Sequence, residues 1–159
     1  MTRGGIFEVS SEGEFKGYGF CTGCDSTAGT TNGFNPLDPV FQGTDGNFYG
    51  TTAYGGIGGS KGGGGGDIGF GTVFQFSNGL SPLVETVPVA GKLGQSVIIL
   101  GYGLTGTTSV TFNGVAADFA VESDTYIRAT VPAGATTGMV SVDTPAGTLK
   151  SNPQFLVTK

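Results

Sequence analysis

The sequence contains no histidine, few charged residues and no long apolar run. Without histidine, the chain cannot form a Ser-His-Asp triad or a Cys-His pair, and it lacks the side chain that most often binds zinc or copper. Lysine and arginine together number only 7 and are scattered, whereas contacts to nucleic-acid phosphates need them clustered. No apolar run approaches the roughly 18 residues of a membrane-spanning helix. We therefore expect no nucleic-acid partner and no membrane span in this chain.

Charged residues make up only 12% of the chain, about half the usual share, and the net charge is -5. The opening residues, MTRGGIFEVS, lack the apolar segment of a signal peptide. Low charge with many glycine, threonine and serine residues is nevertheless typical of extracellular proteins. We therefore expect a piece of a longer exported protein, extracellular or at the cell surface, with its export signal outside this chain.

Glycine accounts for 32 of the 159 residues, about three times its average usage, and it is unevenly placed. Residues 43–79 hold 15 of the 32 glycines, whereas residues 115–159 hold only 3. This difference predicts two modules, a glycine-rich β segment over residues 1–80 and a β-sandwich over residues 81–159. The fold class expected for the whole chain is all-β.

Two cysteines, Cys21 and Cys24, lie in the stretch FCTGCDST. A zinc site would need two further ligands, and the sequence has no second cysteine pair and no histidine. A thioredoxin-type redox pair should open a helix, but the residues that follow, DSTAGTTNG, are typical of a loop. In an oxidising compartment a structural Cys21–Cys24 disulfide is therefore favoured over free thiols and over an active redox pair.

The first half contains a candidate internal repeat. GGIFEV at residues 4–9 and GTVFQF at residues 71–76 share a pattern, with Phe7 and Phe74 at equivalent positions. Between them lies DGNFYGTTAYGG. These three stretches resemble the GloVer tandem repeats of bacterial surface proteins, over about residues 4–80. The resemblance implies propeller-like β blades and, because this chain holds little more than one copy, further repeats of the parent chain as partners.

The stretch GYGLTG, residues 101–106, fits the G-x-G-x-x-G pattern of dinucleotide-binding proteins and follows the apolar run at residues 96–100. Pyrophosphate binding there needs a helix directly after the glycines. The next residues, TTSVTF, are β-branched and alternating, and Asn113-Gly114 predicts a type I′ turn after them. A strand, not a helix, is therefore expected, and we predict no nucleotide or other cofactor.

The second half shows the alternation of half-buried strands. Ile127, Ala129 and Val131 are expected to point inward, as are Val140 and Val142. Residues 90–94 are predicted as a turn. Short strands with turns every 8–12 residues indicate an antiparallel, immunoglobulin-like sandwich. The stretches SVIILGYGL, SVTFNGVAADF, TYIRATVPAGATTGMVSV and TPAGTLKSNPQFLV resemble the IPT/TIG domain, over about residues 82–158. In bacterial proteins the resemblance implies a spacer, an adhesion module or a companion of glycan-active domains.

The acids in the centre of the glycine-rich half, Asp38, Asp45 and Asp67, each lie where a turn is expected, so they indicate no paired catalytic carboxylates. We predict no catalytic and no metal-binding residues. The expected function is non-enzymatic adhesion, or glycan or protein binding; the alternative is an accessory or spacer segment of a larger secreted carbohydrate-active enzyme. A glycan or a cell-surface protein is the expected partner. The ligand-binding residues are not identified by the sequence.

Overall fold

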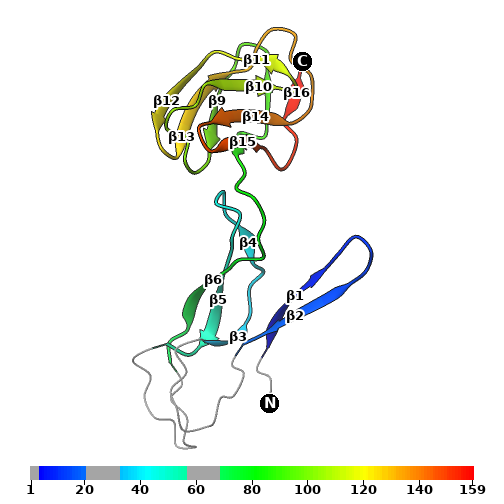
Figure 1. Cartoon of the computed structure of the whole chain (residues 1–159), viewed down its shortest axis with the longest axis vertical. Helices are drawn as coiled ribbons and strands as arrows, with labels where there is room; N and C mark the ends of the chain where they lie inside the picture. Colours follow the sequence, from blue (N-terminus) through cyan, green and yellow to red (C-terminus); the bar gives the residue numbers. More distant parts are fainter. Residues whose placement is uncertain (1–3, 21–32, 57–68) are drawn as a thin grey trace, which may run out of the picture. The chain divides into compact units, whose positions relative to one another are not determined.

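The computed structural model describes residues 4–20, 33–56 and 69–159 (Figure 1). Within these residues the chain is all-β, as predicted. It has there no helix of the length and apolarity needed to cross a membrane. Contacts divide the chain into two compact units: Met1–Gln42 with Phe48–Phe76, called unit 1, and Gly43–Asn47 with Ser77–Lys159, called unit 2.

Unit 2 contains the predicted immunoglobulin-like sandwich. One sheet has the strand order β12-β13-β9-β7, and the other has the order β11-β10-β14-β15. The strands of these sheets are β7 (Glu85–Val87), β9 (Ser96–Leu100), β10 (Ser109–Phe112), β11 (Val115–Ala116), β12 (Phe119–Ser123), β13 (Tyr126–Thr130), β14 (Val140–Thr144) and β15 (Gly147–Lys150). A parallel pair, β8 (Ala90–Lys92) and β16 (Leu156–Thr158), completes the unit.

The core of unit 2 lies between the two sheets and is built by alternation along the strands. On β13, Ile127 and Ala129 are buried while Arg128 between them is exposed, as the sequence predicted. Phe112 and Phe155 meet edge to face, with ring centroids 5.1 Å apart. The remaining core residues are Val84, Val97, Ile99, Leu104, Val110, Val131, Ala135, Val140 and Val142.

Two turns that the sequence predicts in unit 2 can be compared with the structure. Asn113 and Gly114 have φ angles of 46° and 85° and join β10 to β11, which confirms the predicted type I′ turn. The Asn113 side-chain amide donates to the Thr136 hydroxyl at 2.8 Å, so this turn is tied to a neighbouring loop. The turn predicted at residues 90–94 is wrong over its first half, because β8 forms there against β16.

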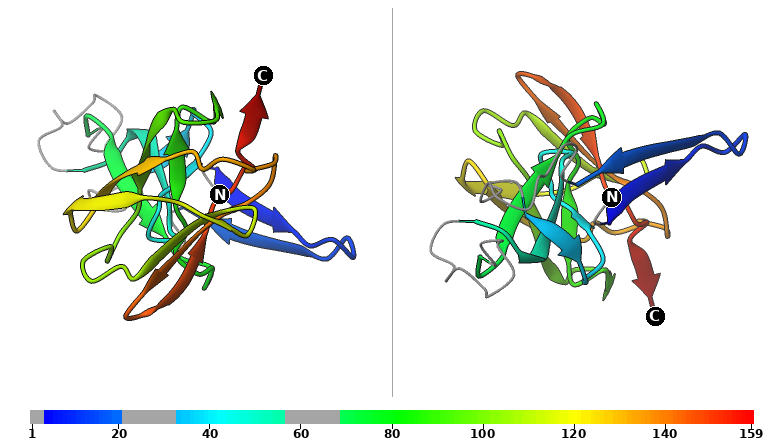
Figure 2. Two further views of the ribbon diagram at one scale, coloured as in Figure 1. Left: turned by 90° about the horizontal axis from the view of Figure 1, so that it is seen from above. Right: turned by 90° about the horizontal axis from the view of Figure 1, so that it is seen from below.

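Unit 1 is organised around its longest described strand, β5 (Phe48–Tyr54). The strands β3 (Phe34–Pro36) and β4 (Phe41–Gln42) pair with β5, and so does β6 (Thr72–Phe76). The first two strands, β1 (Gly5–Val9) and β2 (Phe15–Gly19), form a separate hairpin, drawn in blue in Figure 2.

One face of the β5 sheet is covered by aromatic packing. Tyr18 lies against Phe76 with ring centroids 4.3 Å apart, and Phe20 lies against Phe74 at 4.8 Å. The Phe74 ring lies over Gly50, its partner on β5, where no side chain competes for the space. The two copies of the candidate repeat lie in different sheets, since β1 pairs with β2 in the hairpin and β6 pairs with β5. The described residues therefore do not show the propeller-like blade that the repeat resemblance implies.

Candidate functional site

The opposite face of the β5 sheet carries no covering layer among the described residues of unit 1. We call it the open sheet face and define it by Phe41 on β4, Tyr49 and Thr51 on β5, and Val73 and Gln75 on β6. The strand register places Phe41, Tyr49 and Gln75 in one row across the sheet, and Thr51 beside Val73 in the next row. Phe41 is 64% exposed and Val73 is 79% exposed.

Aromatic rings and polar groups lie side by side on the open sheet face. The rings of Phe41 and Tyr49 stack with centroids 5.6 Å apart and an angle of 23° between their planes. In the adjacent row the Thr51 hydroxyl donates to the Asp38 carboxylate at 3.2 Å. The face therefore offers a stacked pair of aromatic rings, of which Phe41 is exposed and Tyr49 half-buried, next to a carboxylate, a hydroxyl and a carboxamide.

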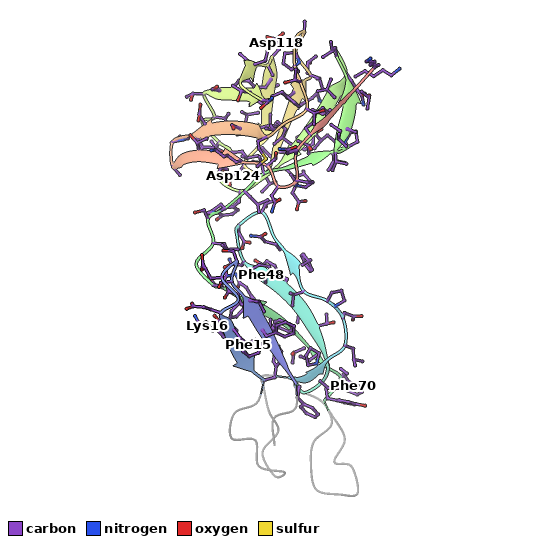
Figure 3. The ribbon with its side chains drawn as sticks, turned by 90° about the vertical axis from the view of Figure 1, so that its right-hand side faces the viewer. Phe15, Lys16, Phe48, Phe70, Asp118 and Asp124 are labelled. Carbon is purple, nitrogen blue, oxygen red and sulfur yellow. The ribbon has the colours of Figure 1, made fainter. Side chains whose placement is uncertain are left out.

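The outer face of the β1–β2 hairpin is a second exposed aromatic surface. Phe7 and Phe15 stack with the same centroid distance of 5.6 Å and the same angle of 23°, and they are 66% and 69% exposed. Gly17 lies opposite Phe7, and the Phe15 ring lies over it. Alternation along the strands places Val9 beside this pair. Figure 3 labels Phe15, together with Phe48 and Phe70 of the same unit.

Three tyrosines differ in how accessible their side chains are. Tyr102 is 62% exposed and Tyr54 is 40% exposed, where its ring stacks on Phe34 with centroids 5.3 Å apart. Tyr49 is half-buried in the stack with Phe41. Only Tyr49 of the three belongs to the open sheet face.

The glycine loop at residues 101–106 serves the fold of unit 2. The backbone N–H groups of Gly103 and Thr105 each donate to the Asp124 carboxylate at 3.3 Å, and the N–H of Leu104 donates to the Asp124 carbonyl at 2.8 Å. The chain then continues into strand β10, as predicted. The amides that a pyrophosphate would need are thus occupied by a side chain of the protein itself.

Hydrogen bonds to the Asp124 carboxylate lower its pKa. The largest contribution is that of the Thr105 hydroxyl, and the backbone amides of Thr105 and Gly103 add to it. A lowered folded-state pKa gives stability that is present above the ordinary carboxyl value of about 3.9 and is lost as the pH falls through the folded-state pKa.

We therefore expect Asp124→Ala to lower the melting temperature of unit 2 at pH 7, and we expect its difference from wild type to shrink below about pH 3.9. Thermal melts at a series of pH values check this, with Asp118→Ala as the control. A difference that is constant down to pH 2 would contradict the assignment.

Three other features of the described residues do not bring several candidate ligand-binding groups together. An open hollow of about 450 Å³ on unit 2 is lined by Leu93, Asp118, Thr130 and Pro132 among others, and Figure 3 labels Asp118. Asp45 accepts hydrogen bonds from the backbone and side-chain amides of Asn47, as a turn residue does. No group of three or more His, Cys, Asp or Glu side chains in the described part of the chain could hold a metal ion.

Two sequence expectations lie outside the described residues. These are the Cys21–Cys24 disulfide, which falls in residues 21–32, and the position of Asp67, which falls in residues 57–68. The disulfide stays a prediction.

Comparison with known proteins identifies an IPT/TIG domain at residues 80–157. This confirms the resemblance of the second half. The comparison gives no evidence for the GloVer tandem repeat, which stays a prediction for about residues 4–80. No curated protein matches the chain.

Among solved structures, the chain is similar to SGBP-B from a complex xyloglucan utilization locus in Bacteroides uniformis. The TM-score is 0.40 and the sequence identity is 12%. The match covers 95% of this chain but only 35% of that one. With a TM-score and a sequence identity this low, the similarity does not indicate the function of this chain.

Proposed function

We propose, with the IPT/TIG domain at residues 80–157 as the premise, that this chain is a non-enzymatic binding module of an exported or cell-surface bacterial protein. In this proposal unit 2 is the carrier, because its Phe112 and Phe155 are buried in its own core and Tyr102 is the one strongly exposed aromatic side chain among its residues. Unit 1 contacts the ligand, which is a glycan or a cell-surface protein. The supporting observation is that unit 1 has two exposed aromatic surfaces, one with Phe7 and Phe15 and the other with Phe41, each of these side chains being more than 60% exposed. Exposed aromatic surface of this kind commonly marks a binding site, and one of the two surfaces is sufficient for the proposed role.

A binding role without catalysis is consistent with the polar groups of the described residues. Asp45 and Asp124 are engaged in turns and loops, and Asp38 is joined to a threonine and not to a second carboxylate or a base. Hydrolysis of a glycan needs two carboxylates on either side of the bond that is cleaved. The alternative, an accessory or spacer segment of a larger secreted carbohydrate-active enzyme, would give unit 1 no ligand of its own.

A glycan array and a panel of extracellular matrix proteins, probed with the full chain, test this function. We expect wild type to bind at least one member and a Phe7→Ser/Phe15→Ser/Phe41→Ser variant to bind it less. Incubation with a bound glycan should release no new reducing ends. Absence of binding by wild type would favour the spacer role, and release of reducing ends would contradict the non-enzymatic assignment.

A further inference from the structure

The two exposed aromatic surfaces of unit 1 have the same ring geometry but different surroundings. Both pairs, Phe7–Phe15 and Phe41–Tyr49, stack at 5.6 Å and 23°. On the hairpin face, alternation places only glycine and Val9 beside the rings. On the open sheet face, Thr51, Gln75 and the Asp38 carboxylate lie next to the rings. A ligand that needs both apolar and hydrogen-bonding contacts can therefore distinguish these surfaces.

The groups on the open sheet face match the two kinds of surface on a sugar ring. The faces of aromatic rings carry the negative part of the ring quadrupole, so they attract the slightly positive C–H groups on the flat side of a pyranose. Hydroxyl groups at the edge of the same pyranose can donate to Asp38 and can exchange hydrogen bonds with Thr51 and Gln75. Phe41 is exposed and Tyr49 is half-buried in the stack with it, so Phe41 offers the larger ring surface to such a pyranose.

The charge on this face selects among glycans. The residues that define the open sheet face include no lysine or arginine, and Asp38 contributes a carboxylate at its edge. An anionic polysaccharide would be repelled by that carboxylate, and nothing in the defined set would pair with its charge. A neutral polymer is not repelled by the Asp38 carboxylate, and its hydroxyl groups can donate a charge-assisted hydrogen bond to it.

We infer that the open sheet face is a binding site for a neutral polysaccharide, with Phe41 and Tyr49 as the stacking surface and Asp38, Thr51 and Gln75 as the hydrogen-bonding edge. This inference rests on the proposed binding function and assigns it to one face and one ligand class. The hairpin face is not the glycan site.

Affinity electrophoresis of the full chain in native gels that contain hydroxyethylcellulose, galactomannan or pullulan tests the inference. At least one of these neutral polymers should retard wild type, whereas the anionic carboxymethylcellulose should retard it less. Phe41→Ala should weaken the apparent affinity by about tenfold or more, on the scale of one lost aromatic contact. Gln75→Ala should weaken it less, and the matched control Phe7→Ala should leave it unchanged.

Each outcome decides the matter. Retardation that is lost in Phe41→Ala and kept in Phe7→Ala supports the inference. Retardation that is lost only in Phe7→Ala, or kept in both Phe41→Ala and Gln75→Ala, overturns it while the proposed binding function stands. Binding of a matrix protein together with no retardation by any neutral polymer also overturns the inference while the proposed binding function stands. Equal melting temperatures of wild type and the three exposed-site variants exclude unfolding as the cause.

Discussion

Phe155→Ala should destabilise unit 2 by about 3–5 kcal/mol, the usual cost of removing a fully buried phenylalanine. Phe155 is 1% exposed and packs edge to face against Phe112. Its backbone also exchanges hydrogen bonds with Gly138 at 2.8 and 3.1 Å, so the position is fixed from both sides. The valines of the same core cluster on β10 and β14 are held by their strands, so they are expected to refill the cavity only in part.

Urea unfolding of the full chain, followed by the amide NMR signals of Ile127 and Ala129, measures this loss. The neighbouring Leu156 is 53% exposed, so Leu156→Ala serves as the control and should cost about 0.5 kcal/mol or less. Equal costs for the two substitutions would mean that Phe155 does not close the core of the sandwich.

Gly50→Ala should destabilise unit 1 by about 1–3 kcal/mol, the range for overpacking a filled site. A Cβ atom at Gly50 would lie 2.5 Å from the tip of the Phe74 ring and 2.9 Å from the next ring carbon. The ring cannot simply tilt away, because Phe20 lies against it with centroids 4.8 Å apart. The substitution should therefore separate the β1–β2 hairpin from the β5 sheet.

The same urea experiment, followed at the amides of Phe74 and Tyr18, measures this effect. Gln75→Ala, on the same strand but on the open sheet face, should stay within about 0.5 kcal/mol of wild type. If Gly50→Ala were as stable as wild type, the hairpin would not depend on the packing of Phe74 over Gly50.

The sandwich could be predicted because short stretches of sequence indicate its strands and turns. The alternation of Ile127 and Ala129 with Arg128, and the Asn113-Gly114 turn, can each be seen within a few residues of sequence. The parallel pairing of β8 with β16 was not predictable, since its two strands lie far apart in the chain and each has only three residues. Likewise, no local pattern links Asp124 to the amides of the glycine loop.

The open sheet face could not be predicted, because both faces of β5 contain aromatic residues. Phe48 and Tyr54 lie on one face and Tyr49 on the other, so alternation gives no preference for which side is buried. The difference arises from the hairpin, whose Tyr18 covers only one side. The candidate repeat fails as a guide for the same reason: Phe7 is exposed on the hairpin, whereas its counterpart Phe74 is packed over Gly50.

The most direct measurement is a titration of the isotope-labelled full chain with cellohexaose, mannohexaose and maltohexaose, followed by amide chemical shifts. We expect at least one of these neutral oligosaccharides to shift the amides of Phe41, Tyr49 and Gln75 in a saturable way, while those of Ile127 and Phe7 stay in place. Shifts confined to unit 2 or to the hairpin, or no shifts with any of the three, would contradict a neutral-glycan site on the open sheet face.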